Sequence, residues 1–584
     1  MKHPSRRVLS PRRKTTRAST PAALAAEQVA HFHLPPDSEI GVAMQRLAAR
    51  LYAAHDDVET LWRLTLRELA TLPGHDRVAL FNAKKFLAFQ LAKLLDTLQN
   101  PTRKVYQSLG HSTATTLAKG PYPTFDNVAA LFSANPVITR TATYIFACSE
   151  WIDDAFQGRE FLHEIYSRLL NPTSIALANH IVDVEAGDQA GDYLAWNFNS
   201  GMAAIDGVLS HLIGHEDVIL ASRNVYGGTY QLLHDWFARR ANLHVGVEFF
   251  DGTTEADFAD ALAAAQTKHA RRLARGRRVY VYLESPCNPH GWFLDVPAIC
   301  RAAHAAGLTV ILDATVGTPF LVRPLQRPEP AERPDFVIHS YTKDLTGDGN
   351  TTAGVVIGRN ADMFTPKGDP GWETTLFWNV YYIKGAFLEA DKAFEVLSGM
   401  KTLEVRMLQK CINTVILARW LNAHPQINVH CPALPEAENH ALCRRLSHLG
   451  LPAPLFTIDF ESAGLDRAVF QRLFDSLSPM FGHMVSLGQN NTVVLCPALT
   501  SHSELSADAL RAAGISPTTI RIAVGDENPR ELIAGFRQTA RLAFPAEFAA
   551  GFMDDESADA LVDETYTAVH AAHVRSQPRL KPNR

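Results

Sequence analysis

Short β-branched runs that alternate with alanine-rich helical patterns constrain the fold of this chain more than any other feature. From about Asn197 onward the runs DVILAS, VYVYLES, LTVILDAT and DFVIHS are separated by patterns such as FADALAAAQTKHARRLA and VPAICRAAHAAG. Strands that alternate with helices pair in parallel, because each crossover returns the chain to the same end of the sheet. The sequence therefore predicts an α/β fold with a doubly wound, mostly parallel sheet, and ligands are expected at the carboxyl ends of its strands.

The rest of the chain divides around this region. The start is rich in arginine and has no acidic residue before Glu27, which predicts a disordered basic tail, with an organelle transit peptide as the alternative. Helical spacing follows, and then a large domain, a smaller α/β domain and a polar end. The predicted parts are a basic tail at 1–35, a helical N-terminal extension at 36–145, a large domain at 146–398, a small C-terminal domain at 399–545 and a C-terminal tail at 546–584.

Composition narrows the class of protein. A chain of 584 residues with 46% hydrophobic residues and a net charge of −5 is typical of a large soluble enzyme, and it lacks the basic excess of nucleic-acid-binding proteins. Seven cysteines without a CxxC pair indicate reduced thiols, so a cytoplasmic location is expected. No apolar run is long enough to cross a bilayer. His211 and His215 are one helical turn apart but have no evident third ligand, so no metal is predicted.

Two residues at predicted strand ends suggest pyridoxal 5'-phosphate (PLP) chemistry. Asp313 closes the run LTVIL, and Lys343 follows PDFVIHS within HSYTK. PLP enzymes need a lysine that bonds the cofactor and an acid that keeps the pyridine nitrogen protonated. Each residue alone is more often a surface lysine or a turn residue. Their placement one crossover apart is what indicates a shared site.

A candidate phosphate site lies at the start of a predicted helix. Ser200, Gly201 and Met202 precede AAIDGVLSHL, so free backbone N–H groups would point at a ligand there. The alternative is that Ser200 is an ordinary helix N-cap that binds no ligand. Ser340 and Thr342 flank Lys343 and supply further hydroxyl donors. Tyr226 lies in VYGGTY, where two glycines allow a close approach of the backbone to a ligand.

Seven motifs occur in an order that resembles the Cys/Met-metabolism (transsulfuration) family of PLP enzymes. They are YSRLLNPT, SGMAAI, YGGTY, ESPCNP, LDATVGTPF, HSYTK and IRIAVGDEN, and they span roughly Ile165 to Ala543. The family includes cystathionine γ-synthase and γ-lyase, methionine γ-lyase and O-acetylhomoserine sulfhydrylase. The resemblance implies the aspartate-aminotransferase-like fold (fold type I) and a homodimer with shared active sites, often paired into a homotetramer.

The resemblance also implies roles for individual residues. Lys343 matches the cofactor-bonding lysine, Asp313 the pyridinium partner and Tyr226 the tyrosine that stacks on the ring and exchanges protons. Arg521 matches the arginine that grips the substrate carboxylate, and Ser486 matches a residue that lines the substrate end. The remaining matches are the phosphate contacts Gly201, Met202, Ser340 and Thr342, the residue Asn288 near the cofactor's phenolic oxygen, and Tyr166 and Arg168, which are expected to reach across from the partner subunit.

Departures from the family pattern leave the substrate open. Ala314 stands where the family often has asparagine, Tyr341 where it has alanine, and Cys496 where many members have histidine. Gly228 replaces the cysteine of methionine γ-lyases, and Val485 stands where cystathionine enzymes carry glutamate. The expected reaction is γ-replacement or γ-elimination on a homoserine ester or sulfur amino acid, with sulfhydrylase or cystathionine-synthase chemistry first and a γ-lyase next. A PLP-binding scaffold with little catalysis is the alternative.

Overall fold

The computed structural model describes residues 20–31, 34–68, 71–108, 112–119, 133–144, 156, 165–465, 467–500, 510 and 514–577. The described residues form two compact units, one within 20–137 and the other within 138–577. The start of the predicted large domain, at residue 146, and the seven motifs therefore fall in the second unit. Among the described residues, no helix is long and apolar enough to cross a membrane.

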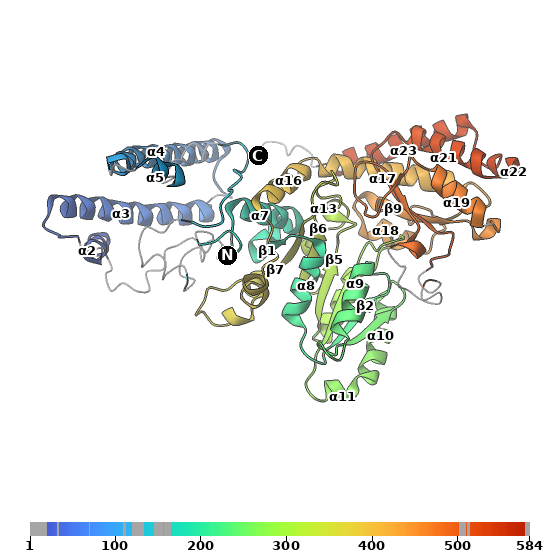
Figure 1. Cartoon of the computed structure of the whole chain (residues 1–584), viewed down its shortest axis with the longest axis horizontal. Helices are drawn as coiled ribbons and strands as arrows, with labels where there is room; N and C mark the ends of the chain where they lie inside the picture. The colour runs from blue at the N-terminus through green and yellow to red at the C-terminus, as the bar shows by residue number, and fades with distance from the viewer. Residues whose placement is uncertain are drawn as a thin grey trace. The chain divides into compact units, whose positions relative to one another are not determined.

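A seven-stranded sheet forms the centre of the second unit (Figure 1). Its order is β1-β7-β6-β5-β4-β2-β3. The five strands from β6 to β3 run parallel to one another, whereas β7 is antiparallel to both β1 and β6. The strands are β1 Tyr193–Phe198, β2 Val218–Ser222, β3 Gly246–Phe250, β4 Val279–Glu284, β5 Thr309–Asp313, β6 Phe336–Ser340 and β7 Gly354–Arg359. The predicted mostly parallel sheet is confirmed.

Both faces of this sheet are buried, which explains why its strands are continuous apolar runs. Successive residues of a strand point to opposite faces, so Val310 and Leu312 belong to one core cluster while Ile311 belongs to the other. Helices surround the sheet. They are α7 Pro172–Ala186, α8 Gly201–Leu212, α9 Gly227–Gln231, α10 Glu255–Lys268, α11 Ala270–Leu273, α12 Val296–Ala305, α13 Thr318–Leu321, α14 Asn360–Met363, α15 Tyr382–Lys384 and α16 Ala390–Met400. Among them, α7, α8, α10 and α12 contact its strands directly.

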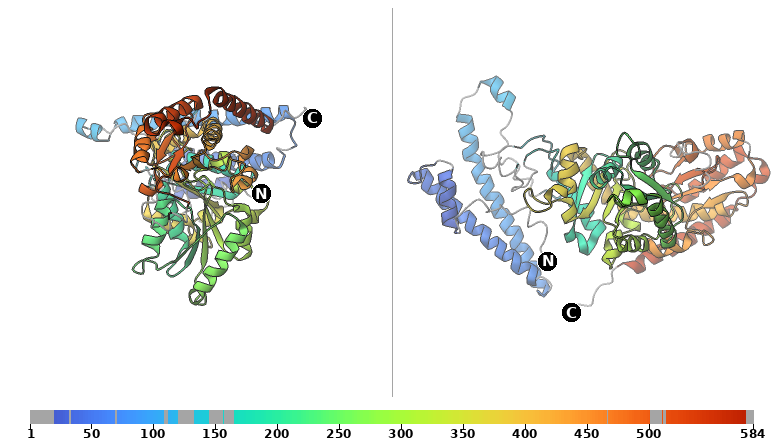
Figure 2. Two further views of the ribbon diagram at one scale, coloured as in Figure 1. Left: turned by 90° about the vertical axis from the view of Figure 1, so that its right-hand side faces the viewer. Right: turned by 90° about the horizontal axis from the view of Figure 1, so that it is seen from below.

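A second, five-stranded sheet follows the long helix α17 Leu403–Asn422. Its order is β10-β11-β12-β9-β8, and it shares the first core cluster with the large sheet. The strands are β8 Asn428–His430, β9 Leu455–Asp459, β10 Gly482–His483, β11 Val493–Leu495 and β12 Ile520–Ala523, and the helices are α18 His440–Leu446, α19 Arg467–Ser476 and α21 Pro529–Ala543. In both views of Figure 2 these orange and red segments lie together.

Residues 546–584 differ from the predicted C-terminal tail. They contain α22 Ala546–Ala549 and the helix α23 Asp555–Ser576, which packs against α17. Phe552 stacks on Trp420 with ring centroids 4.8 Å apart, and Leu561 and Val562 are buried. The mostly polar sequence of this segment did not reveal these apolar residues. Leu561 and Val562 lie on the buried face of α23, and Phe552 lies just before that helix. The final residues 578–584 lie outside the described part.

The first unit is helical, as predicted for the N-terminal extension. Its helices are α2 Pro21–His31, α3 Glu39–Glu68, α4 Gly74–Ser108 and α5 Thr113–Lys119. Helix α2 falls within the predicted basic tail, and it contacts α3 through a face on which Leu24, Ala25 and Val29 are buried. That part of the tail is therefore ordered by apolar packing, while residues 1–19 lie outside the described part.

Candidate active site

A cavity of about 640 Å³ lies at the carboxyl ends of the parallel strands. Strand ends carry polar groups there because the neighbouring strands open onto one edge of the sheet. Its lining unites most of the residues predicted from sequence. Among the lining residues are Gly201, Met202, Tyr226, Asn288, Asp313, Ser340, Thr342, Lys343, Ser486 and Arg521.

Lys343 lies just after β6, with its amine directed to the loop that follows β10. Its Nζ donates a hydrogen bond to Ser486 Oγ at 2.7 Å. Burial, and next the positive charge of Arg521, lower the pKa of Lys343 to about 8. A larger share of the amine is therefore neutral near pH 7.5 than in an ordinary lysine. A neutral amine is the form that can attack a carbonyl or accept a proton.

The backbone around Lys343 is clamped by a buried ion pair that the sequence analysis did not identify. Lys410 of α17 binds the Asp344 carboxylate at 2.8 Å, and both side chains are almost completely buried. Arg406 donates to the carbonyl of Asp344 at 2.8 Å. Gly488, at φ +83°, lies so close that a Cβ there would come within 2.8 Å of Lys343 Cα. The position of the lysine is thus set by residues that are distant in the sequence.

Asp313 ends β5 and is buried at the base of the cavity. Its Oδ1 accepts the backbone N–H of Thr315 at 3.0 Å. Burial raises the pKa of this carboxyl above its ordinary value. A cation that binds beside it would offset this cost and keep the carboxylate ionised.

The N-terminus of α8 forms one wall of the cavity. Ser200 caps the helix by accepting the N–H of Ala203 at 3.1 Å. Gly201 touches Ser340, because a Cβ on this glycine would lie 2.8 Å from the Ser340 Cβ. Close backbone approach, free N–H groups and the Ser340 and Thr342 hydroxyls make this wall suitable for an anion such as a phosphate.

One carboxylate holds two predicted site residues in place. Glu284, at the end of β4, accepts the backbone N–H of Tyr226 at 2.6 Å through Oε2 and that of Asn288 at 3.1 Å through Oε1. Burial, and next the nearby Asp313, raise the pKa of Glu284 well above its ordinary value. No role for Glu284 was predicted from the sequence, although Glu284 lies at the end of a predicted strand, as Asp313 does.

Arg521 crosses from β12 to the mouth of the cavity. Its Nη1 donates to Asn288 Oδ1 at 3.0 Å, and Nη2 donates to the carbonyl of Ser486. Within the described part of the chain, its buried Nε has no hydrogen-bond partner, and burial lowers the pKa of the guanidinium to about 9. Ser486 has φ +119°, a strained value for a residue other than glycine. A buried guanidinium with an open donor is suited to an anion.

Tyr166 and Arg168 lie away from the cavity of their own chain. Tyr166 pairs with Thr143 in an isolated bridge, and Arg168 donates to the carbonyl of Tyr382 at 2.7 Å. The Arg168 guanidinium lies 5.6 Å from the centre of the Tyr166 ring. The structure therefore does not bring these two residues together with Lys343 within one chain.

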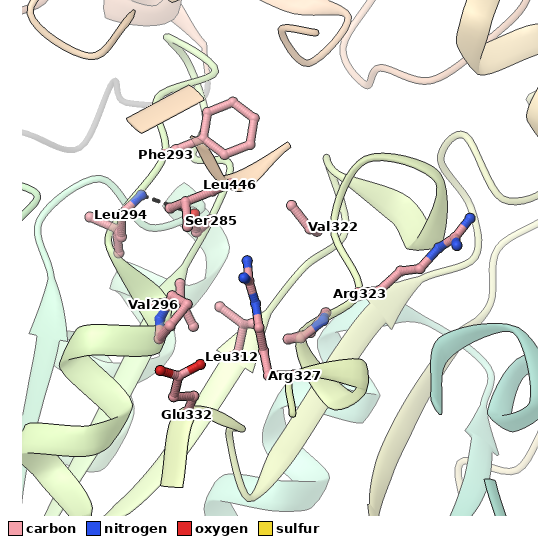
Figure 3. Close-up of a pocket in the computed structure, with 12 residues that line it drawn as sticks. Ser285, Phe293, Leu294, Val296, Leu312, Val322, Arg323, Arg327, Glu332 and Leu446 are labelled. Carbon is pink, nitrogen blue, oxygen red and sulfur yellow. Dashed lines mark hydrogen bonds between the residues drawn. The ribbon is translucent and has the colours of Figure 1, made fainter. Parts of the chain in front are cut away.

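A second cavity lies on the other side of β5 and is much smaller. It has a volume of about 30 Å³, roughly the space of one water molecule. Figure 3 shows Arg327 extending into it near Leu312, with Glu332 at its lower edge. Because Leu312 points away from the face that carries Asp313, this cavity is separate from the large one. Its size makes it unsuitable for a substrate.

Comparison with known proteins resolves the class of enzyme. Residues 125–541 match the model of the Cys/Met metabolism PLP-dependent enzyme family, which is more than half of the chain. The chain belongs to this family. The resemblance inferred from the seven motifs is thereby confirmed, as are the fold class and the conclusion that this is a PLP-dependent enzyme of the transsulfuration type.

Individual relatives in this family differ in their reactions. The chain is 32% identical to L-methionine gamma-lyase of Pseudomonas putida over 70% of its own length and 92% of the relative. It is 31% identical to O-succinylhomoserine sulfhydrylase of Pseudomonas aeruginosa over 68% and 87%. A structure of a putative O-acetylhomoserine (thiol)-lyase from Campylobacter jejuni, which contains a pyridoxyl-lysine monophosphate, has 27% identity and a TM-score of 0.60 over 70% and 96%.

The large cavity suits the family's cofactor. It offers a buried amine of lowered pKa on Lys343, a buried carboxylate on Asp313 and a helix N-terminus with Gly201 at its start. These groups match an aldehyde, a pyridinium and a phosphate respectively. The protonated ring of the cofactor is a cation, and bound in this cavity it would lower the pKa of the buried Asp313 and Glu284 carboxyls and so favour their ionised form.

Proposed function

We propose that this enzyme catalyses γ-replacement or γ-elimination on a homoserine ester or sulfur amino acid, with sulfhydrylase or cystathionine-synthase chemistry first and γ-lyase chemistry next. The observation that carries the proposal is the position of Arg521. Its side chain lines the cavity that also holds Lys343, and its buried Nε has no hydrogen-bond partner among the described residues. An α-amino acid substrate requires a group that binds its carboxylate and, beside it, an amine that is partly neutral at neutral pH.

In this proposal, PLP would be held by Lys343, by Asp313 at its ring nitrogen, by Gly201, Met202, Ser340 and Thr342 at its phosphate, by Tyr226 against its ring and by Asn288 near its phenolic oxygen. When bound, it supplies a ring that withdraws electrons from the carbon next to the substrate amine. Asp313 would keep the ring nitrogen protonated and so maintain that withdrawal.

The protein's own groups would position the substrate and move its protons. Arg521 would bind the α-carboxylate as a planar fork, and Ser486 would contribute its backbone and hydroxyl beside it. This places the substrate Cα near Lys343 Nζ. With a pKa of about 8, this amine can accept the Cα proton and later return it at a neighbouring carbon.

Tyr226 is the proposed acid for the leaving atom. Its side chain is 43% exposed and lines the cavity, while its backbone is fixed by Glu284.

Val485 and Leu495 line the cavity as well. Among the described lining residues, Asp313 and Glu284 are the carboxylates, and both lie at strand ends. The apolar side chains of Val485 and Leu495 offer no partner for a second ammonium, which within this proposal supports sulfide or a small thiol, and so sulfhydrylase chemistry, ahead of cysteine as the incoming group.

We propose that the active unit is a homodimer and that two such dimers can pair into a homotetramer. Tyr166 and Arg168 would reach the cofactor phosphate of the partner subunit, which agrees with their distance from their own cavity. Their side chains provide a hydroxyl and a cation for that phosphate.

Absorbance spectroscopy of the purified enzyme tests the proposal. O-acetylhomoserine or O-succinylhomoserine with sulfide, cystathionine and methionine are added separately, and thioether, thiol and keto acid are measured. We expect a visible cofactor band that one of these substrates changes, with product formed from it. Lys343→Ala should lose the band, whereas Lys367→Ala, at an exposed lysine, should keep it. A stable cofactor band with no product from any of these substrates would refute the proposed reaction.

A further inference from the structure

Helix α3 carries a continuous apolar stripe on its exposed surface (blue in Figure 1). Its members are spaced alternately by four and three residues, and they are Ile40, Met44, Leu47, Leu51, Ala54 and Val58. The larger five are 39% to 65% exposed, and Ala54 is exposed as well. A stripe with this heptad spacing is the seam of a coiled coil.

The stripe differs from the face that α3 uses within its own unit. The less exposed residues Gly41, Gln45 and Ala48 follow another line along the helix, and α2 is a helix that contacts α3. Five large apolar side chains in one exposed row are more than a solvated helix face needs. Such a row is typical of a surface covered by another helix.

We propose that α3 pairs with the α3 of a second copy of this chain as an antiparallel coiled coil. The seam is self-complementary about a two-fold axis midway between Leu51 and Ala54. Leu61, three residues beyond Val58, continues the stripe and is 39% exposed. In the antiparallel register the layers join Met44 to Leu61, Leu47 to Val58 and Leu51 to Ala54 of the second copy. Each layer thus sets one side chain against a different one, and every layer recurs by symmetry.

Charge complementarity favours the antiparallel direction. Arg50 and Asp57 flank the seam at equivalent heptad positions, and both are exposed. The antiparallel register brings Arg50 of each copy beside Asp57 of the other, within about 3 Å along the axis. In a parallel pair the two would lie about 10 Å apart along the axis, and a residue at this heptad position would not face its equivalent. Flanking charges of this kind set the direction of pairing.

This inference is independent of the reaction proposed above. It assigns the N-terminal helices a role in joining copies of the chain, in addition to any contact made by the catalytic units. Because one seam joins two chains, it would either reinforce a dimer or join dimers into a larger assembly.

Photo-crosslinking in the full-length, cofactor-loaded enzyme tests the pairing. A photoreactive phenylalanine replaces Val58, and ¹⁵N-labelled and unlabelled chains that were produced separately are mixed and refolded with the cofactor. We expect cross-links from position 58 to residues 44–51 of a differently labelled chain. Cross-links confined to one chain, for example to α4, would overturn the proposal, as would a cross-link to position 58 of the second copy.

Charge swaps provide a matched control. Arg50→Asp and Asp57→Arg should each lower the yield of the inter-chain cross-link about five-fold, since each creates like charges across the seam. The double variant should restore it, because the pairs are re-formed with exchanged signs. Arg46→Asp, outside the seam, should leave the yield unchanged. Equal yields in all four variants would exclude the antiparallel register.

Discussion

The two ends of the large cavity are built in different ways. At the proposed cofactor end, Asp313 and Glu284 lie at the ends of adjacent parallel strands, so the sheet itself sets their spacing. Lys343 follows the next strand, where Lys410 and Arg406 hold the backbone of Asp344 beside it. At the proposed substrate end, Ser486 and Val485 lie on a loop with strained backbone, and Arg521 comes from the second sheet.

Because they are built differently, the two ends should differ in how well they tolerate amino-acid substitutions. A group at a strand end moves only if the sheet moves, because ladder hydrogen bonds hold it on both sides. A loop residue such as Val485 can be exchanged without a change in the sheet. The cofactor end should therefore be sensitive to small changes, and the side-chain end should mainly change substrate preference.

The largest effect is expected from Lys343→Ala. Removal of the amine removes both the bond to the cofactor and the proposed proton carrier, so turnover should fall by at least about 10³-fold. The visible cofactor band should disappear even when PLP is present in excess. A variant that keeps its turnover would contradict the whole assignment of the cofactor end.

Arg521→Ala should mainly weaken substrate binding. Loss of a buried, charge-assisted fork should lower kcat/KM by about 100-fold. Arg521→Lys should lose less, because it keeps the charge but not the fork. Steady-state kinetics with a spectrum of the resting enzyme checks this. A changed resting band with a normal KM would instead place Arg521 at the cofactor end.

Glu284→Gln should disturb the cofactor end without removing any group that would touch the substrate. The amide offers one acceptor where the backbone N–H groups of Tyr226 and Asn288 need two, so kcat should fall about ten-fold. Glu284→Asp, which keeps both oxygens, should recover part of the loss. We expect the resting absorbance maximum to shift in the glutamine variant, which a purely structural role would not produce.

The pH dependence of cofactor attachment should reflect the lowered pKa of Lys343. The neutral amine is the reactive form, so attachment of PLP to the apoenzyme should accelerate about ten-fold from pH 7 to 9 and level off above a pKa of about 8. Stopped-flow absorbance measures this. A rate that still rises steeply above pH 10 would show that the lysine has its ordinary pKa.

Val485→Glu should have the smallest effect. Val485 is 74% exposed, so the substitution should not disturb folding or the resting spectrum. The ratio of kcat/KM for cystathionine to that for O-acetylhomoserine should rise a few-fold, because a carboxylate can attract a second ammonium. Val485→Gln is the uncharged control. A spectral change in either variant would show that the two ends are not separable.

The strand pattern predicted the main sheet and the places of Asp313 and Lys343 because a parallel strand is a local, continuous apolar run whose end is visible in the text. Glu284 also ends a predicted strand, so its place was equally visible in the sequence. The packing of residues 546–577 was not predicted, since Phe552 becomes informative only once Trp420 is known to lie opposite it.

By itself, then, the sequence determined the class of fold, the family and the order of the cofactor-end residues, because these depend on local periodicity and on short motifs. The tertiary structure alone brought Ser486 within 2.7 Å of Lys343, joined Lys410 to Asp344 and buried Arg521 beside Asn288. These contacts link residues far apart in the chain, and the lowered pKa of Lys343 arises from burial, which no local pattern of residues encodes.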